Sequence, residues 1–183
     1  MEKILSSLKM LGIVSRSQLQ IICELGSTRS AFRALDDVKE YVNKFREGEN
    51  MYYLNAEGRK LVGSKKVIKK MTTAMHYIMR NDLYIAFGCP HNWKNEQRIK
   101  VGKINVISDA YFEHNGIINI IEVDHKQKMA ANKIKIAKYR EIFSNTKKDV
   151  RFTWITLTEY RKQQILELSD GLNVNVFLAS DFH

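Results

Sequence analysis

The sequence predicts an α+β protein in two parts, and three observations support this prediction. Apolar residues recur at the 3.6-residue spacing of helices through most of residues 1–63. Two β-rich runs then flank Asn115-Gly116, which is the strongest short-range signal for a β-hairpin. Strand and helix patterns alternate from there onward, which is typical of a mixed sheet flanked by helices. We expect a domain over residues 1–63, a linker helix within 64–92 and an α/β domain over 93–183.

The composition is that of a globular protein without a membrane partner. Hydrophobic residues make up 44% of the 183 residues and charged residues 27%. No apolar run approaches the roughly 18–20 residues that a membrane helix needs, and the N-terminus has no signal-peptide core. Cys23 and Cys89 fit neither a disulfide framework nor a zinc-binding spacing. These features predict a cytoplasmic location.

The net charge of +10 at pH 7 indicates a polyanionic partner. Much of the positive charge lies in two clusters, within residues 65–70 and 126–140. Phosphate backbones attract such clusters through counterion release, so the charge favours nucleic acid. For the helical part of the second cluster, Lys133–Arg140, the alternative is an ordinary solvated helix face.

Three short helices are expected in the first part. Apolar residues from Ile4 to Leu11 predict a helix that ends at Gly12. Ser15 is the expected N-cap of a second helix, which Gly26 closes. Ser27 is the expected cap of a third helix, which runs from Thr28 to about Leu35 and turns Ala31, Phe32 and Leu35 inward.

A hairpin and a closing helix follow. The predicted strands lie within residues 38–45 and 51–54, with Arg46–Asn50 as the loop between them. Asn55 caps a last helix over Ala56–Val62. This order of elements is that of a winged helix-turn-helix domain.

Such a domain inserts the N-terminal part of its third helix into the major groove of double-stranded DNA, and a dimer reads two half-sites. We expect DNA contacts from the third helix and from the hairpin. The candidates are Ser27, Thr28, Arg29, Ser30 and Arg33 on the helix, and Lys39, Lys44 and Arg46 beside it. The alternative is a small helical interaction domain whose basic face is merely solvated.

The middle and second parts complete the predicted fold. Residues 67–87 fit one long helix that stops before Gly88. Extended segments are expected over 100–105 and 106–112, followed by the hairpin to Asp124. A helix is expected over Met129–Phe143, with Ala130, Ile134, Ala137, Ile142 and Phe143 at helical intervals. A strand over 150–157, a helix capped by Thr158 and a strand over 173–178 follow. The order β-β-β-α-β-α-β is also the core order of restriction-endonuclease-like nucleases.

Three acidic residues are expected to gather at the Asn-Gly hairpin. Glu122 and Asp124 share a face of their strand because side chains two positions apart point the same way. Asp109 joins them from the partner strand. Converging carboxylates are how proteins hold Mg²⁺, so these residues are the candidate metal ligands. The alternative is a group of solvated acids at strand ends.

Four segments carry a resemblance to the replication–relaxation family of plasmid and phage proteins. They are Ser108–Phe112, Ile121–Asp124, Lys133–Tyr139 and His76–Leu83, and the similarity covers essentially the whole chain. The resemblance implies a DNA-binding protein of a mobile element, acting in replication or relaxation with replication or relaxosome proteins as partners. It also implies an endonuclease-like C-terminal domain.

The nuclease pattern is incomplete in this chain. The PD-(D/E)-x-K pattern takes its first acid from Asp109 but then meets Glu122-Val123-Asp124, so an acid replaces the lysine. Cleavage needs a cation that stabilises developing negative charge. Lys126, or Lys133 from the next helix, would have to supply it, and Glu96 would add a ligand if it lay on a nearby helix. Lys133 and Lys138 are also candidates for contact with the DNA backbone.

Three functions from different classes remain open on the sequence. The favoured one is a double-stranded DNA-binding accessory protein with a degenerate nuclease-like domain, because the missing lysine departs directly from cleavage chemistry. The second is a Mg²⁺-dependent endonuclease that uses Asp109, Glu122 and Asp124. The third is a winged-helix transcriptional repressor.

Overall fold

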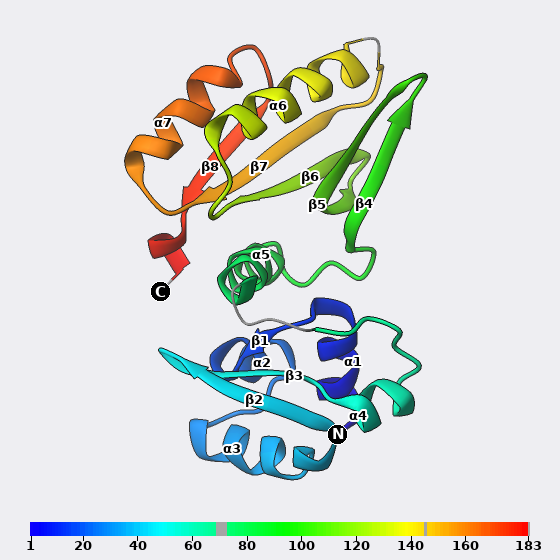
Figure 1. Ribbon diagram of the computed structural model, residues 1–183, viewed down its shortest axis with the longest axis vertical. Helices are drawn as coiled ribbons and strands as arrows, with labels where there is room; N and C mark the ends of the chain where they lie inside the picture. The colour runs from blue at the N-terminus through cyan, green and yellow to red at the C-terminus, as the bar shows by residue number, and fades with distance from the viewer. Residues whose placement is uncertain (69–72, 145, 183) are drawn as a thin grey trace. The chain divides into compact units, whose positions relative to one another are not determined.

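The computed structural model describes residues 1–68, 73–144 and 146–182, which form two compact units, Met1–Cys89 and Pro90–His183 (Figure 1). It confirms the predicted α+β class, with a separate sheet in each unit. The linker helix was expected within residues 64–92, and the part of this segment up to Cys89 belongs to the first unit. In the described ranges, every helix is too short or too polar to cross a lipid bilayer.

The first unit combines short helices with a three-stranded antiparallel sheet of order β1-β3-β2. Its elements are α1 (Glu2–Leu11), β1 (Val14–Ser15), α2 (Arg16–Ile22), α3 (Thr28–Asp36), a 3₁₀ turn (Lys39–Tyr41), β2 (Val42–Glu47), β3 (Glu49–Leu54), α4 (Ala56–Leu61) and α5 (Ala74–Ala86).

The predicted helix starts are confirmed by their hydrogen bonds. The side chains of Ser15, Ser27 and Asn55 each accept the backbone N–H three residues ahead. Ser15 and Gln18 complete a reciprocal capping box. Because these bonds satisfy donors that a helix start leaves unpaired, the local sequence is enough to set where α2, α3 and α4 begin.

Two expectations for the first unit are wrong. The hairpin loop is not Arg46–Asn50, because the strands pair through Glu47 and Glu49 and leave only Gly48, at φ +72°, to turn the chain. Phe32 does not face inward with Ala31 and Leu35; its side chain is 48% exposed.

Helix α5 starts later than the sequence pattern suggested. Residues 64–68 are irregular and α5 begins at Ala74; the expected helical residue Met71 and the clustered Lys69 and Lys70 lie outside the described residues.

Buried polar side chains then fix α5 in the first unit. Arg80 donates to the carbonyl of Leu11 (2.6 Å) and Asn81 to that of Ile13 (2.8 Å). Gln18 donates to Asp82 (2.6 Å). Buried carbonyls without partners are costly, so these bonds hold α5 against the segment that precedes α2.

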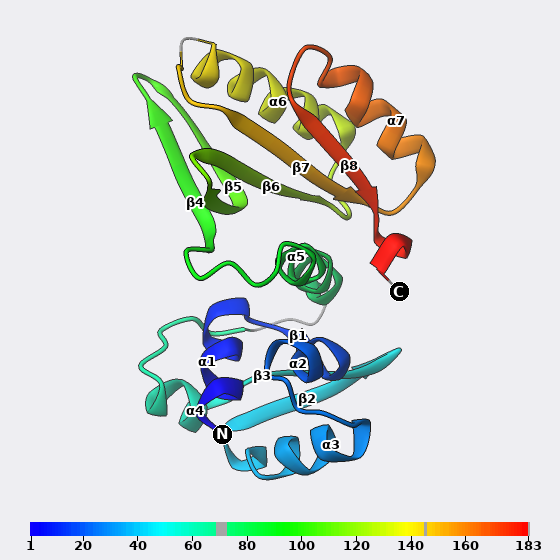
Figure 2. The same ribbon diagram turned by 180° about the vertical axis from the view of Figure 1, so that it is seen from behind.

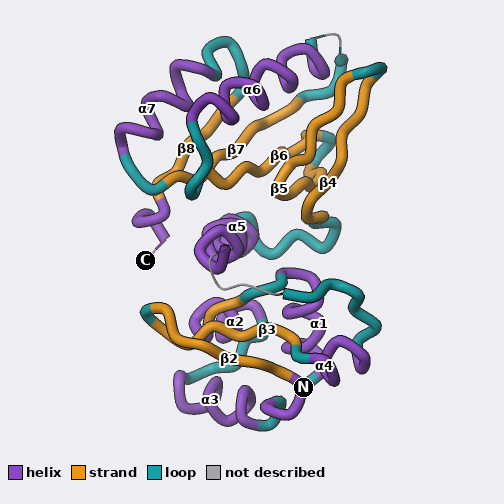
Figure 3. The backbone as a smooth tube through the Cα atoms, in the orientation of Figure 1, coloured by secondary structure: helices purple, strands orange, loops and turns teal. Residues whose placement is uncertain are grey.

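The second unit is a five-stranded mixed sheet of order β4-β5-β6-β7-β8 (Figure 3). Strands β4, β5 and β6 pair antiparallel, whereas β6, β7 and β8 pair parallel. The elements are β4 (Lys94–Val101), β5 (Ile104–His114), β6 (Ile117–Asp124), α6 (Met129–Phe143), β7 (Val150–Thr156), α7 (Glu159–Leu168), β8 (Val174–Leu178) and a final 3₁₀ turn (Ala179–Phe182).

Both crossover helices, α6 and α7, lie on the same face of this sheet, as the two opposite views show (Figures 1 and 2). The hydrophobic core fills the space between them and the strands, with Ile120, Phe152 and Trp154 from the sheet and Ile136 and Ile165 from the helices.

The two hairpins of this sheet differ in how well the sequence predicts them. Asn115 and Gly116 both have positive φ and join His114 to Ile117 as a two-residue loop, which confirms the expected turn. The extended segment expected over 100–105 instead contains the turn at Gly102, where φ is +57°. Glu96 lies on β4 and not on a helix, at φ 52°; the pairs on either side of it, Asn95 with Ala110 and Gln97 with Ser108, place it opposite Asp109.

The apolar pattern of α6 matches its buried face only in part: Ile142 is buried and Phe143 packs against the core. Ala130, Ile134 and Ala137 are exposed, and Ile134 is 60% exposed. The buried residues are Asn132, Ile136, Tyr139 and Ile142. Part of the pattern misleads because three polar side chains of α6, those of Asn132, Lys135 and Tyr139, face acidic partners on the sheet.

The first testable prediction compares two glycines with positive φ. A Cβ on Gly12 (φ +84°) would lie 2.6 Å from Cε1 of Tyr77, whereas a Cβ on Gly26 (φ +71°) meets nothing within 4 Å. We expect Gly26→Ala to cost about 1–2 kcal/mol of unfolding free energy from backbone strain alone. Gly12→Ala should cost about 1 kcal/mol or more beyond that, because Tyr77 has to move. Equal losses in urea denaturation of the two variants would contradict this packing.

Candidate functional site

The three predicted acids lie close together in the second unit. Glu122 and Asp124 are fully buried on the face of β6 that α6 covers. The register pairs Ala110 with Ile121, so Asp109 lies across from Glu122 at the next position. Asp109 is only partly buried, and its Oδ2 accepts the backbone N–H of Val123 at 2.7 Å.

Asp124 accepts four hydrogen bonds from three side chains. Arg161 donates to it twice, from Nε and from Nη2, each at 2.6 Å. Asn132 and Thr156 donate at 2.7 Å each. Burial by itself would raise the pKa of Asp124, but the hydrogen bonds from Arg161, Asn132 and Thr156 outweigh it and lower that pKa. Asp124 is therefore ionised, with both oxygens engaged by the protein.

These donors come from three different elements. Asn132 lies at the start of α6, Thr156 ends β7, and Arg161 lies in the first turn of α7. Arg161 also donates to the carbonyl of Gln127 (2.9 Å), whose side chain donates to Asn132 (2.9 Å). One carboxylate thus ties the ends of the parallel strands to both helices.

Glu122 has a different environment. Lys135 and Tyr139, four residues apart on α6, both donate hydrogen bonds to its carboxylate. Burial and then the charge of Asp109 raise the pKa of Glu122, while the contacts with Lys135 and Tyr139 act in the opposite direction. Burial and the neighbouring Glu122 also raise the pKa of Tyr139, which therefore stays a hydrogen-bond donor.

The lysine beside the acids is not one of the expected ones. Lys126 is exposed in the segment after β6, and Lys133 and Lys138 are exposed on α6. Lys135 makes the ion pair with Glu122. Its signal in the sequence is the spacing of Asn132, Lys135 and Tyr139, which places them on one helical face, but a search for apolar residues passes over it.

These contacts bear on the magnesium prediction. Among the residues described, no group of three or more His, Cys, Asp or Glu side chains is arranged to hold a metal ion. A three-carboxylate site that includes Asp124 does not fit, because Arg161 occupies both of its oxygens. Asp109 and Glu122 are the remaining candidate ligands, and a magnesium site on them stays a prediction.

The predicted DNA-binding residues of the first unit are all exposed. Arg29, Ser30 and Arg33 lie on the outer face of α3. They follow the capping residue Ser27 and the first helical residue, Thr28, in the sequence. Lys44 and Arg46 are exposed on β2. The side chain of Ser27 is partly used, since it accepts the N–H of Ser30 at 3.2 Å.

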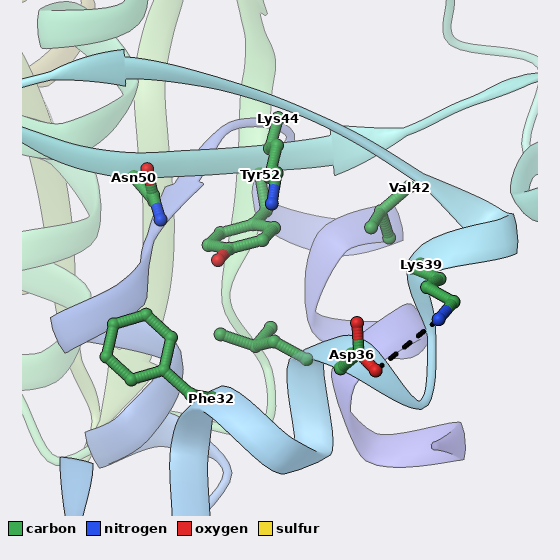
Figure 4. A pocket seen from close by; sticks show the side chains of 8 residues that line it. Phe32, Asp36, Lys39, Val42, Lys44, Asn50 and Tyr52 are labelled. Atoms are coloured by element: carbon green, nitrogen blue, oxygen red, sulfur yellow. Dashed lines mark hydrogen bonds and ion pairs between the residues drawn. The ribbon is translucent and has the colours of Figure 1, made fainter. Parts of the chain in front are cut away.

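A groove separates α3 from the β2–β3 hairpin (Figure 4). It encloses about 380 Å³ and contains apolar side chains together with Lys39 and Lys44. Lys39 is 3.4 Å from Asp36, which also lines the groove. The complete lining is Phe32, Leu35, Asp36, Lys39, Val42, Lys44, Asn50 and Tyr52.

The structure therefore defines an α+β protein with a basic, grooved first unit and a mixed-sheet second unit that contains buried acids. Comparison with known families goes further. The family model described as replication-relaxation matches residues 5–155, and the chain belongs to that family. The resemblance inferred from the sequence motifs is thereby confirmed.

Two other comparisons complete the findings. A crystal structure of protein VC1899 from Vibrio cholerae aligns with 94% of this chain at 14% identity and a TM-score of 0.39. This chain spans 47% of the length of that one. None of the curated proteins matches the chain.

The second prediction concerns the Arg161–Asp124 pair. Arg161→Met leaves a fully buried carboxylate without its cation, so we expect a loss of about 3 kcal/mol of unfolding free energy. Arg140 is exposed and donates to one backbone carbonyl, that of Leu168, so Arg140→Met is the matched control and should cost about 1 kcal/mol or less. Similar losses in both variants, measured by urea denaturation, would show that the buried pair adds no stability.

The loss in Arg161→Met should also depend on pH. In the native protein the pKa of Asp124 is lowered, so its stabilising effect is present above the ordinary aspartate pKa and disappears as the pH falls through the lowered value. Without Arg161, we expect burial to outweigh the bonds from Asn132 and Thr156 and to raise that pKa, so that protonation relieves the unpaired charge. The difference from wild type should therefore be largest near pH 7 and shrink toward about pH 4. A constant difference over that range would contradict the assignment.

Proposed function

We propose that this protein binds double-stranded DNA through its first unit and acts in the replication or relaxation of the DNA of a mobile element, such as a plasmid or phage. Membership of the replication–relaxation family supports a role in replication or relaxation. The observation that carries DNA binding is the exposed row on α3, in which Arg29, Ser30 and Arg33 stand beside the basic strand β2.

The order of elements supports a winged helix-turn-helix domain. Helices α1, α2 and α3 precede the β2–β3 hairpin, and β1 joins that hairpin as the third strand. In such domains the third helix enters the major groove. Arg29 and Arg33 would then reach guanine edges, and the hydroxyls of Thr28 and Ser30 would reach phosphates or bases. Lys44 and Arg46 would hold the flanking backbone.

For the second unit we propose a nuclease-like scaffold that does not cut DNA. The strand and helix order is that of restriction-endonuclease-like domains, but Asp124 is committed to Arg161 and the expected lysine is absent from β6. The exposed Lys133 and Lys138 supply backbone contacts in this proposal. Replication or relaxosome proteins and a second copy of the chain are the proposed partners.

One observation favours the second candidate, a Mg²⁺-dependent endonuclease. Lys135 brings a cation to Glu122 from α6, beside Asp109, so the positive charge that the Glu-x-Lys pattern takes from its strand is present on the following helix. Asp109 and Glu122 would be the metal ligands, with Asp124 as a structural residue.

The third prediction tests DNA recognition. Arg29→Ala and Arg33→Ala should each weaken specific duplex binding by about 1–3 kcal/mol if these side chains read bases. Lys60→Ala, an exposed change on α4, is the control and should leave the affinity close to that of wild type. The measurement is fluorescence anisotropy on a duplex found by footprinting the element's own DNA. Unchanged affinity in both arginine variants would refute the assignment of α3.

The footprint also separates this proposal from the repressor hypothesis. Protection at an origin of replication or transfer supports the accessory role, whereas protection confined to a promoter would favour a transcriptional repressor.

The fourth prediction separates scaffold from nuclease. On the favoured proposal, supercoiled plasmid incubated with the protein and Mg²⁺ or Mn²⁺ stays intact. Nicking that disappears in Asp109→Ala, Glu122→Ala and Lys135→Met, but persists in Lys133→Met, would overturn the scaffold proposal and identify Lys135 as the required cation.

A further inference from the structure

We propose that the groove between α3 and the β2–β3 hairpin binds one unpaired nucleotide, with its base stacked on the ring of Phe32 over a floor formed by Leu35 and Tyr52. This inference rests on the proposed function, in that the same unit binds the duplex beside the unpaired position. It adds a ligand class, because it predicts that the protein prefers a duplex interrupted by an unpaired base over a continuous one.

The groove has the shape and surface of a site for a small aromatic group. Its volume of about 380 Å³ lies within the range of small-ligand sites, which are concave and mostly apolar. Leu35 and Tyr52 are buried beneath it, with 3% and 4% of their surface exposed. The exposed apolar surface at the groove is therefore that of Phe32, and a base stacked on it would remove that surface from water.

Phe32 supplies the exposed ring of this site, and the guanidinium of Arg16 lies 5.8 Å from the centroid of that ring. Phe32 lies on α3 next to the buried positions Ala31 and Leu35, yet it is 48% exposed. Figure 4 shows the rings of Phe32 and Tyr52 at the same end of the groove, with Asn50 above them. Aromatic rings of this kind stack on bases of any sequence, and an amide at the edge adds hydrogen bonding to the base.

The charges around the groove suit a nucleotide and not a neutral apolar ligand. Lys44 pairs across the hairpin with Tyr52 and lies beside its ring (Figure 4). In the described part of the chain no hydrogen bond or ion pair is found for Lys44, so its ammonium is available to a phosphate. The only acid in the lining, Asp36, is offset by Lys39. Arg46, opposite Asn50 in the hairpin, extends the positive charge beyond the groove.

The groove is also next to the face that we assign to the duplex. Successive helical residues are separated by about 100°, so Arg29 and Arg33 follow Phe32 and Asp36 around α3. A strand tracked by Arg29 and Arg33 therefore passes the open side of the groove. An unpaired base in that strand has only to rotate out of the helix to meet Phe32.

The test uses the full-length protein and three oligonucleotides of one sequence. The first is a continuous duplex, the second has a single unpaired thymidine, and the third has an abasic residue at that place. We expect the unpaired thymidine to raise the affinity in fluorescence anisotropy by about fivefold or more over both others, because base stacking contributes at least that much. Equal affinity for the thymidine and abasic oligonucleotides would overturn the inference, since it would show that only backbone flexibility is read.

Variants locate the effect in the groove. Phe32→Ala should bring the ratio of the affinities for the unpaired and continuous duplexes to about one, and Phe32→Leu, which keeps an apolar side chain but removes the ring, should do the same. Ile21→Ala, at an apolar residue of α2 that is 57% exposed and lies outside the groove, should keep the wild-type ratio. A ratio that survives both Phe32 variants would contradict the proposal.

The two proposals fail in different ways. If no continuous duplex binds but the unpaired thymidine still binds through Phe32, duplex recognition by α3 is wrong and the groove site stands. If Arg33→Ala weakens binding to every oligonucleotide while the thymidine brings no gain, the duplex proposal stands and the groove site is wrong.

Discussion

The second unit depends most on one of its two fully buried carboxylates, that of Asp124, and on the arginine that neutralises it. An isolated buried charge costs several kcal/mol, so the fold has to keep Arg161 and the two neutral donors in place together. Because those donors come from α6, β7 and α7, the requirement sets where both helices start relative to the sheet. It also removes Asp124 from the candidate metal ligands, since a carboxylate with both oxygens bound to an arginine is not free for a metal ion.

The first unit uses buried polar groups for a similar purpose. Asn81 and Arg80 of α5 satisfy the carbonyls of Ile13 and Leu11, where the chain passes from α1 to α2. These hydrogen bonds hold α5 against the segment between α1 and α2, while α3 and the hairpin keep their basic residues exposed. The side chains of the proposed binding surface are therefore largely not needed for packing within the unit. The partly exposed ring of Phe32 belongs to this surface.

The position of Lys135 suits both functions considered for the second unit, the scaffold and the nuclease. Through its ion pair with Glu122 it stabilises a buried acid, which is all that a scaffold requires. The same ammonium lies beside Glu122 and Asp109, where a nuclease would need a cation. Structural and catalytic roles thus place the same residue at the same position, and only a measurement of DNA cleavage distinguishes them.

Local signals in the sequence determined the helix starts at Ser15, Ser27, Asn55 and Thr158, the Asn115-Gly116 turn and the order of strands and helices in the second unit. Each depends on hydrogen bonds or backbone preferences within a few residues, so the sequence suffices. Only the tertiary structure decided that Lys135 reaches Glu122, that Arg161 reaches Asp124 and that Phe32 faces solvent. Arg161 and Asp124 are 37 residues apart, and no local pattern specifies such a partner. The rotation of α6 follows from the acids it meets on the sheet, which is why Ala130, Ile134 and Ala137 stay exposed although they fit the apolar pattern.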